Sequence, residues 1–462
     1  MEPPSSLWWS SLNESVTPRR SLDHHVDVDV AIVGGGFTGL WTARELLRRD
    51  PTLRIAVVEK SVCGFGASGR NGGWASGLFP VSEATILRQH GMESLVQLRR
   101  ILHEAVRRLG AVLVEDGIDA DFVQGGTLTF ARSEVQAERL RDSVHDAREI
   151  GVHADDLAWL EGDALRERGV VAGALGATYS PHCARINPAK LVRGLSDVVE
   201  RLGATIFENT TVTRIIPGRR GHQPQVVTLG GTIHADFVVR ATEGFTPTLP
   251  GERRTVAPIY SLMIATQPQS AHFWDEAGFG RYETFADDRH LIIYGQRTVD
   301  DRIAFGGRGS PYHFGSTVEE RFDQSPKVFG MLEATLRELF PNLEGSATHR
   351  WGGPLAMPRD MWPSVLVEPT SGLASAGGYT GDGVVMSHVA ATALADLITN
   401  PDGDTEFSEL PFVQHRNPKW EVEPLRWLGI NVGLGLANVA DRTEALKGRE
   451  SRASAWLDRM TG

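Results

Sequence analysis

The sequence predicts an α/β protein with a discontinuous parallel-sheet domain, an α+β domain built on an antiparallel sheet, and a helical C-terminal tail. Three observations support this prediction. An apolar strand, a glycine turn, a helix and a second strand follow one another near the N-terminus. Strand-like segments without intervening helices fill the middle of the chain, and the last sixty residues read as helical. At 462 residues, the chain is long enough for two or three domains.

The opening unit begins with VDVDVAIV, residues 26–33, which alternates and then becomes fully apolar, as a strand buried in a parallel sheet does. GGGFTG, residues 34–39, matches the pattern G-x-G-x-x-G, and the helix after it places Leu40, Ala43 and Leu47 on one face. A second apolar strand, residues 53–58, leads to an acid. This order predicts a β-α-β unit.

Each part of this unit has a role in binding an adenine dinucleotide. Gly34 permits the tight turn, Gly36 lets the backbone approach a pyrophosphate, and Gly39 lets helix and strand pack closely. The helix N-terminus offers free N–H groups to phosphates, and Glu59 can accept hydrogen bonds from ribose hydroxyls. A ligand-free β-α-β unit is the alternative, but it does not explain why an acid stands at this spacing. We therefore expect a Rossmann-like domain here.

A second glycine run, GFGASGRNGG at residues 64–73, repeats the same pattern without a strand directly before it. As a bare pattern it reads as a loop. Because it follows the predicted ribose-binding strand, it should face the crevice at the carboxyl ends of the strands.

The segments that follow give an ordered series of helices and strands. We expect helices at residues 82–109, 133–150, 191–202, 328–340 and 385–397, and strand regions at 122–130, 204–215, 226–242, 258–268, 290–296 and 301–309. Between residues 256 and 350 strands and helices do not alternate as in parallel β-α-β units, so an antiparallel sheet is predicted there. In the tail, Trp420, Leu425, Trp427 and Leu428 are expected to be packed, and residues 430–440 are expected to be buried.

Composition excludes several classes of protein. A net charge of −11 argues against nucleic-acid binding, and no apolar run is long enough for a membrane span. The N-terminus lacks the features of a secretory signal. Two cysteines, Cys63 and Cys183, cannot form a disulfide framework or a cysteine-rich metal site, which favours a cytoplasmic location. His24 and His25 stand without further ligands, so we expect no metal site.

Several motifs together resemble the glycine oxidase and D-amino acid oxidase superfamily of FAD enzymes, most closely its γ-glutamylputrescine oxidase-like branch of amine oxidoreductases. The opening unit and the second glycine run carry the first part of this resemblance. Further matching stretches are SLWW at 6–9, INPAKLVRGL at 186–195, VVRATEGF at 238–245, RWGGPLAMPRDMWP at 350–363, GGYTGDGV at 377–384 and FVQHRNPKWEVEPLRWLG at 412–429. They occur in the family's order along nearly the whole chain.

The resemblance implies a discontinuous Rossmann-like FAD-binding domain at 26–110, 180–250 and 351–405, and a substrate domain at 111–179 and 251–350. An N-terminal arm, 1–25, and the helical C-terminal tail, 406–462, complete the chain. The implied FAD contacts come from the two glycine runs, the second strand, the crossover segment and the flavin loop. They are Gly34, Gly36, Phe37, Thr38, Gly39, Glu59, Lys60, Gly66, Ala67, Ser68, Arg70, Asn71, Gly72, Gly73, Trp74, Val212, Ala241, Thr242, Gly352, Gly378, Tyr379, Thr380, Gly381, Asp382, Gly383 and Val384.

The implied activity is FAD-dependent oxidation of a small primary or secondary amine. Hydride passes to flavin N5, and the imine is hydrolysed to an aldehyde. Tyr260, Trp351 and Tyr379 are the candidate catalytic residues. Further aromatic candidates for the amine pocket are Tyr294, Trp362 and Trp74, and each of these aromatic residues could equally be core packing. Arg308 could neutralise a substrate carboxylate or could be a surface arginine.

Two departures from the family bear on cofactor attachment and electron acceptor. Asp382 stands where the family loop often has histidine, and neither cysteine lies where a covalent flavin bond forms, so we expect non-covalent FAD. None of the five lysines falls on the predicted substrate-domain strands, so the acceptor can be oxygen or another molecule. A D-amino acid or sarcosine-type enzyme, a non-catalytic flavoprotein and a flavin monooxygenase are the alternatives; the last needs a second nucleotide fingerprint, which the sequence lacks.

Overall fold

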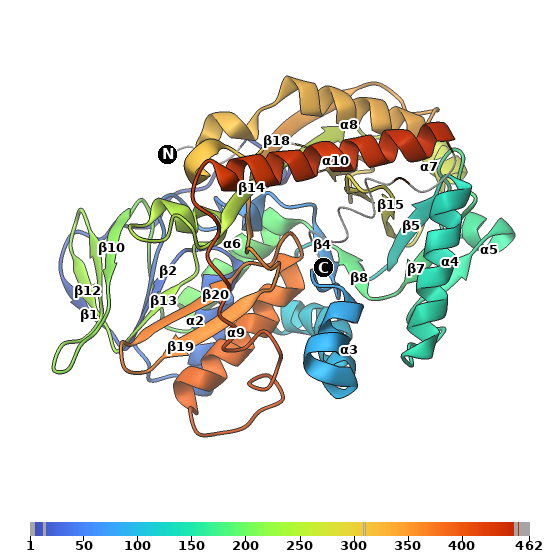
Figure 1. The fold of residues 1–462 in the computed structure, drawn as a ribbon. Helices are drawn as coiled ribbons and strands as arrows, with labels where there is room; N and C mark the ends of the chain where they lie inside the picture. The colour runs from blue at the N-terminus through green and yellow to red at the C-terminus, as the bar shows by residue number, and fades with distance from the viewer. Residues whose placement is uncertain (1–4, 13–14, 308, 310, 448–450, 452–462) are drawn as a thin grey trace.

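The fold is described from a computed structural model, in which residues 5–12, 15–307, 309, 311–447 and 451 are placed well enough to describe. Two large sheets organise these residues, and Figure 1 shows them with a smaller sheet at one end and the helix α10 along the periphery. Among the described helices, none is both long and apolar enough to cross a membrane.

The first large sheet has six strands in the order β19-β20-β13-β2-β3-β9. All of its neighbours pair in parallel except β19 and β20. The central strands β2 and β3 are fully buried, as the continuous apolar runs predict. The strands are β2 (Val30–Val33), β3 (Ile55–Val58), β9 (Thr205–Phe207), β13 (Phe237–Arg240), β19 (Ser364–Glu368) and β20 (Leu373–Gly377).

Four helices accompany this sheet and share one apolar core with it, which includes Trp41, Leu195 and Leu394. They are α2 (Phe37–Arg49), α3 (Glu83–Asp116), α6 (Pro188–Arg201) and α9 (Gly383–Thr399). The helix expected at 82–109 extends to Asp116, and Gly91 interrupts it with a φ of 82°.

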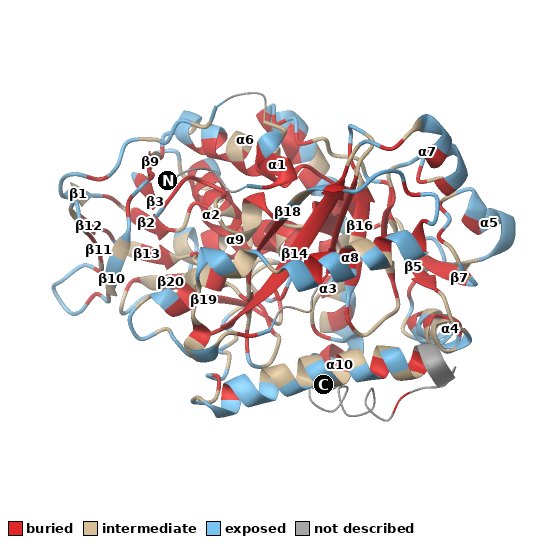
Figure 2. Cartoon of the chain, turned by 90° about the horizontal axis from the view of Figure 1, so that it is seen from above, coloured by how far each residue is buried: buried red, intermediate tan, exposed pale blue. Residues whose placement is uncertain are grey.

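The second large sheet has eight strands in the order β18-β14-β17-β16-β15-β5-β7-β6. Figure 2 shows its central strands as buried, and its core packs around Tyr260, Phe285 and Phe305. The strands are β5 (Thr127–Ala131), β6 (Ala158–Leu160), β7 (Gly176–Ser180), β14 (Ala257–Thr266), β15 (Thr284–Asp287), β16 (Ile293–Arg297), β17 (Ile303–Gly307) and β18 (Ala347–Met357).

Helices and short turns flank this larger sheet and the connections around it. The helices are α4 (Glu134–Glu149), α5 (Gly162–Arg166), α7 (Ala271–Ala277) and α8 (Pro326–Leu339), and the 3-10 turns are η1 (Ala67–Gly69), η2 (Glu243–Thr248), η3 (Phe314–Ser316) and η4 (Glu320–Asp323). The remaining strands form a four-stranded sheet, β1 (Val26–Asp27), β10 (Val212–Ile216), β11 (Gln225–Thr228) and β12 (Thr232–His234), and a ribbon, β4 (Trp74–Ser76) and β8 (Cys183–Arg185).

The structure differs from three expectations about strands. The larger sheet is not wholly antiparallel, because β15 pairs in parallel with β5, a strand from far earlier in the chain. The single strand expected at 204–215 is two strands, β9 and β10, in different sheets, with Asn209 between them at a φ of 50°. We expected the FAD-binding domain to resume at 351, but β18 continues the larger sheet to Met357.

The ends of the chain differ in burial. The short helix α1 (Leu7–Ser10) is buried, and the indole N–H of Trp8 donates to the carbonyl of Asn71. In the tail, Trp420 is buried as expected, but Leu425, Trp427 and Leu428 are exposed. The segment 430–440, expected to be buried, lies on the half-exposed helix α10 (Leu425–Lys447). The predictions for residues 425–440 were wrong. Polar residues of α10 contact the body of the protein and turn apolar side chains outward, and apolar composition alone does not reveal such contacts.

Candidate active site

A cavity of about 400 Å³ lies where the two large sheets meet. The carboxyl ends of β2, β3 and β13 form one wall, and residues of β14 and β18 form the other. Its position at the strand ends of an α/β sheet is the usual place for a ligand.

The first glycine run forms the turn between β2 and α2, as the sequence predicts. Gly34 has a φ of +117°, and a Cβ there would lie 2.3 Å from the carbonyl oxygen of Ala241. A Cβ on Gly39 would lie 2.0 Å from the carbonyl oxygen of Gly34. Both positions therefore require glycine. The helix begins after Gly36, which has no side chain to cap it, so the first turn of α2 presents backbone to the cavity.

Glu59 follows β3 and lines the cavity, as its spacing predicts. Its carboxylate accepts hydrogen bonds from the backbone N–H of Gly35 at 2.8 Å and of Ser61 at 2.9 Å. Burial raises the pKa of Glu59, and these N–H groups oppose the shift. The carboxylate is thus held rigidly at the strand end where a ribose is expected.

The second glycine run continues the same wall through η1. Arg70 is buried, and its Nη1 donates to Asp323 Oδ2 at 2.6 Å and to the carbonyl oxygen of Gly352 at 2.9 Å. Gly72 and Gly73 do not line the cavity. Added Cβ atoms there would meet the Tyr294 ring at 2.6 Å and the Gln296 amide at 1.9 Å, so these glycines allow the larger sheet to pack on the loop.

The flavin-loop motif forms the turn between β20 and α9. Gly378, Thr380 and Gly381 all have positive φ, which makes the turn tight. The hydroxyl of Tyr379 lies 3.0 Å from Thr38 Oγ1, which joins this turn to α2. The pKa of Tyr379 is raised by burial and then by the charge of a nearby glutamate.

That glutamate is Glu243, a cavity residue that the sequence analysis missed. Its Oε2 accepts a hydrogen bond from the backbone N–H of Gly378 at 2.8 Å. Burial raises the pKa of Glu243 to about 7, although backbone hydrogen bonds oppose the shift. Glu243 directly follows Ala241 and Thr242 at the end of β13. An acid at this strand end, like Glu59 after β3, was the sequence signal that could have identified it as a cavity residue.

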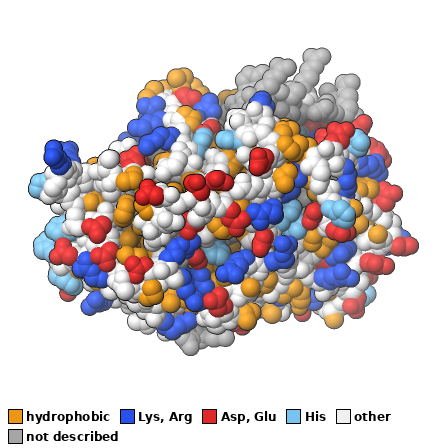
Figure 3. All heavy atoms as spheres, turned by 90° about the horizontal axis from the view of Figure 1, so that it is seen from below, with side chains coloured by type: hydrophobic (Ala, Val, Ile, Leu, Met, Phe, Trp, Pro, Cys, Tyr) orange, Lys and Arg blue, Asp and Glu red, His pale blue; other side chains and the backbone are white. Residues whose placement is uncertain are grey.

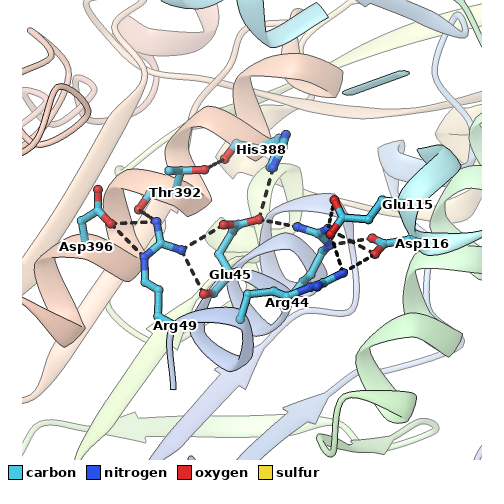
Figure 4. Close-up of polar contacts among 9 residues, drawn as sticks. Arg44, Glu45, Arg49, Glu115, Asp116, His388, Thr392 and Asp396 are labelled. Atoms are coloured by element: carbon cyan, nitrogen blue, oxygen red, sulfur yellow. Dashed lines mark hydrogen bonds and ion pairs between the residues drawn. The ribbon is translucent and has the colours of Figure 1, made fainter. Parts of the chain in front are cut away.

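A buried polar network holds α2 against α9 behind the cavity (Figure 4). Glu45 of α2 accepts hydrogen bonds from Arg44 at 2.7 Å and Arg49 at 2.9 Å, and its Oε1 lies 3.3 Å from His388 Nε2 of α9. Arg49 also donates to Asp396 of α9 at 2.8 Å, and Arg44 extends the network to α3. Both helices begin at the cavity, so this network fixes their relative position.

The larger sheet supplies side chains to the opposite wall. Tyr260 is buried, and its hydroxyl donates to the carbonyl oxygen of Glu319 at 3.3 Å. Burial raises the pKa of Tyr260 above its usual range. Glu319, Glu320 and Asp323 also line this end. Nothing in the local sequence distinguished these three acids from ordinary loop residues, because they reach the cavity only where the turn η4 packs against β14 and β18.

Eighteen of the implied FAD contacts line the cavity: Gly34, Gly36, Phe37, Thr38, Glu59, Lys60, Gly66, Ala67, Ser68, Arg70, Asn71, Val212, Ala241, Thr242, Tyr379, Gly381, Gly383 and Val384. The other implied contacts do not line it: Gly39, Gly72, Gly73, Trp74, Gly352, Gly378, Thr380 and Asp382. The three catalytic candidates divide in the same way. Tyr260 and Tyr379 line the cavity, but Trp351 is buried behind it and donates from its indole to the carbonyl of Arg70 at 2.8 Å.

The remaining aromatic candidates pack elsewhere. Tyr294 bonds Ser261 at 2.7 Å and meets the Trp74 ring edge-on, and neither lines the cavity. Trp362 packs against Phe79. These are contacts of the kind that core packing makes. Arg308 lies outside the described residues.

One group of possible metal ligands lies in another part of the structure. Atoms of His103, Asp156 and His182 lie within 4.8 Å of one another. The two imidazole rings stack at 3.5 Å with an angle of 9°, so their in-plane lone pairs run side by side and do not converge on one ion. Burial, followed by the charge of His182, lowers the pKa of His103 to about 4, which keeps that ring neutral near pH 7.

Comparisons with known proteins agree with this geometry. A family model described as FAD dependent oxidoreductase (DAO) matches residues 29–397. The chain is 27% identical to γ-glutamylputrescine oxidoreductase of Escherichia coli (strain K12), covering 88% of this chain and 92% of that protein. It is 26% identical to glycine oxidase of Geobacillus kaustophilus (strain HTA426), covering 83% and 96%. The crystal structure of a glycine oxidase from Geobacillus kaustophilus superposes with a TM-score of 0.71 at 23% identity, covering 85% of this chain and 100% of that one.

Proposed function

The chain belongs to the DAO family of FAD-dependent oxidoreductases, and from that premise we propose that it oxidises a small amine of the γ-glutamylputrescine kind. A bound FAD would supply a hydride acceptor at N5, and the hydride would come from the carbon next to the amine nitrogen. Water then hydrolyses the resulting imine to an aldehyde. Members of this family act on amines or amino acids, so the choice between these two classes depends on the cavity wall opposite the glycine turn.

The residues around the cavity fit FAD. A Cβ on Gly36 would come within 2.9 Å of Ser68 Oγ, and one on Gly34 would collide with backbone. Any residue larger than glycine at these two positions of the turn would therefore clash with its neighbours. Glu59 would hold the ribose, and the starts of α2 and α9 would face the pyrophosphate and the ring. In the described part of the chain, both cysteines are buried and unpaired, which supports non-covalent binding.

The observation that carries the proposal is the charge of the larger-sheet wall. Among the described residues that line the cavity, the cations are Arg70, which Asp323 neutralises at 2.6 Å, and Lys60, which lies on the opposite wall next to Glu59. Glu319 also lines this end, where its carboxylate pairs with Arg321 at 2.5 Å, and Glu320 adds a further carboxylate. An amino acid substrate needs a free cation for its carboxylate, whereas an ammonium group is attracted by acids. This wall therefore favours an amine.

Three features of the chain would serve the reaction directly. Tyr260 and Tyr379 would form polar and aromatic walls beside the substrate. The acids would attract the ammonium form and accept its proton, because hydride transfer needs a neutral amine. The larger sheet would cover the site and exclude bulk water.

The partners we propose are a small-molecule amine and an electron acceptor, either oxygen or another molecule. Burial raises the pKa of both Cys63 and Cys183, the latter to about 12, which keeps them as thiols. Buried thiols without disulfides suit a reducing compartment, so we propose a cytoplasmic location.

Product analysis tests the proposal. FAD-loaded protein is incubated with γ-glutamylputrescine, simple primary and secondary amines, sarcosine, glycine and D-amino acids, with oxygen or an artificial acceptor. Carbonyl products are trapped as hydrazones and identified. We expect aldehydes from γ-glutamylputrescine and from the simple primary and secondary amines. Formation of 2-oxo acids alone would instead assign the chain to the amino acid oxidases.

A further inference from the structure

Glu243 lies at a junction of the two large sheets beside the cavity. The strands β13 and β20 are neighbours in the six-stranded sheet, with Arg240 paired to Ser375. Glu243 begins η2 just after β13, and the turn at Gly378 follows β20 and leads into α9. Ala356, which donates a backbone hydrogen bond to Glu243, belongs to β18 of the eight-stranded sheet. One side chain thus contacts both sheets and the turn between β20 and α9.

The hydrogen bonds that the carboxylate of Glu243 accepts come from backbone N–H groups. The N–H of Gly378 donates to Oε2 at 2.8 Å, and the N–H of Tyr379 donates to Oε1 at 3.4 Å, which is a longer and weaker contact. Ala356 adds a third backbone N–H. Because these donors belong to the main chain, the carboxylate fixes the path of the chain and not the rotamer of a side chain. It therefore anchors the turn itself.

The backbone on both sides of this contact takes unusual conformations. Glu243 has a φ of 40°, a region that few residues other than glycine adopt. Gly377 has a φ of 154°, and a Cβ there would lie 2.7 Å from Glu243 Oε2. Such conformations persist where the surrounding structure requires them, and they are frequent at ligand sites. Here the backbone is arranged so that the carboxylate can approach the turn closely.

The anchored turn positions two helix starts that face the cavity. The hydroxyl of Tyr379 lies 3.0 Å from Thr38 Oγ1, in the first turn of α2. The helix α9 begins at Gly383, a few residues after the turn. Thr38, Tyr379 and Gly383 all line the cavity. A shift of the turn would therefore move groups of both helices that face a bound dinucleotide.

Glu243 differs from the acids on the outside of the molecule. Figure 3 shows one face on which acidic and basic side chains are interspersed, where the solvent screens each charge. Glu243 is instead partly buried and lines the cavity. We propose that Glu243 is a positioning residue for FAD, whose carboxylate holds the turn between β20 and α9 in the conformation that binds the cofactor. This proposal depends on FAD binding, which family membership establishes, and not on the amine substrate.

The charge of Glu243 should link FAD binding to pH. Among the described residues, the charged or titratable groups that face it are Arg240 on β13 and Tyr379 on the turn, while β18 contributes backbone. Burial raises the pKa of Glu243 to about 7. A bound FAD would exclude water from the carboxylate and bring the negative charge of its diphosphate into the same cavity, and both effects favour the protonated form. FAD binding should therefore take up a proton, and the affinity for FAD should fall as the pH rises above about 7.

Titration of the FAD-free full chain with FAD tests the proposal, with flavin fluorescence as the measure of binding. At pH 6 we expect Glu243→Ala to raise the dissociation constant by roughly 10- to 100-fold, because the turn loses its anchor. Glu243→Gln keeps an acceptor oxygen for the Gly378 N–H, so it should bind FAD within about threefold of the natural chain. Equal binding by Glu243→Ala, or a loss in Glu243→Gln as large as in Glu243→Ala, overturns the proposal.

The pH dependence separates this role from a purely structural one. Between pH 6 and pH 8 the FAD affinity of the natural chain should fall by several-fold, whereas that of Glu243→Gln should stay nearly constant. Glu368→Gln is the matched control and should behave like the natural chain, because Glu368 ends β19 of the same sheet and pairs with Arg416 at 2.9 Å outside the cavity. An identical fall in Glu243→Gln overturns the proposed link to Glu243. This comparison holds even where Glu243→Ala does not fold, and a failure to oxidise amines leaves it unaffected.

Discussion

The two walls of the cavity are built in different ways. The wall from the six-stranded sheet is mostly backbone, with Gly34 and Gly36 at the turn and the starts of α2 and α9 facing inward. The wall from the eight-stranded sheet and the turn η4 is made of side chains, with Tyr260 from the sheet and Glu319 and Asp323 from the turn. A backbone wall suits a cofactor common to a whole family, whereas a wall of side chains can change with the substrate. Variants on the two walls should therefore fail in different ways.

The largest effect is expected on the backbone wall, at Gly34. In Gly34→Ala the added Cβ would meet the Ala241 carbonyl, and the backbone strain alone costs roughly 1–3 kcal/mol. We expect loss of bound FAD, measured as the visible absorbance that remains after gel filtration. Gly330→Ala is the control, because nothing lies within 4 Å of that added Cβ. Full flavin content in Gly34→Ala would show that the turn does not form the cradle.

The next effect is expected on the side-chain wall, at Asp323. Asp323→Asn would release Arg70 from its ion pair while FAD binding persists. Because a free arginine binds carboxylates, kcat/KM should fall for the amine by roughly 10- to 100-fold, which corresponds to about 1.4–2.8 kcal/mol, and should rise for sarcosine or D-amino acids. Steady-state kinetics on both substrate classes measure this change. Asp300→Asn, at a surface ion pair with Arg302, serves as the control. An unchanged ratio between the classes would contradict the assignment of this wall.

The last effect is on stability and is expected behind the backbone wall, at Glu45. Burial alone would raise the pKa of Glu45, but His388, Arg49 and Arg44 outweigh it and lower the pKa to about 2. A carboxyl with a depressed pKa stabilises the fold above its ordinary pKa near 4.5, and this stabilisation is lost as pH falls toward 2.

Glu45→Gln should therefore cost about 1–3 kcal/mol at pH 7, and progressively less between pH 4.5 and pH 2. Denaturant unfolding across this range measures the difference between the two proteins. A difference independent of pH would show that the carboxylate charge does not hold α2 to α9.

The backbone wall could be predicted from the sequence because its signals are local. The strand, the glycine turn, the helix and Glu59 are contiguous, and Gly34 takes the conformation that the pattern requires. The family resemblance also placed Tyr379 and Val384 at the cavity.

The side-chain wall could not be predicted in the same way. Asp323 reaches Arg70 only because two distant segments meet, and Trp351 lies behind the cavity because β18 continues past it in the larger sheet. The parallel pairing of β15 with β5 has the same origin, since it joins strands that are far apart in the chain. The exposure of the apolar side chains of α10 could not be predicted, because apolar composition alone suggested burial.

Anaerobic reduction of the bound flavin is the most direct test of the central claim, which is that one wall of the cavity binds the cofactor and the other selects the substrate. FAD-loaded protein is mixed with γ-glutamylputrescine, simple amines, sarcosine and D-amino acids, and the visible flavin bands are followed. Amines should bleach these bands rapidly, and amino acids should do so slowly or not at all. Bleaching by amino acids alone, or by none of these compounds, would contradict the assignment of the acidic wall to an amine substrate.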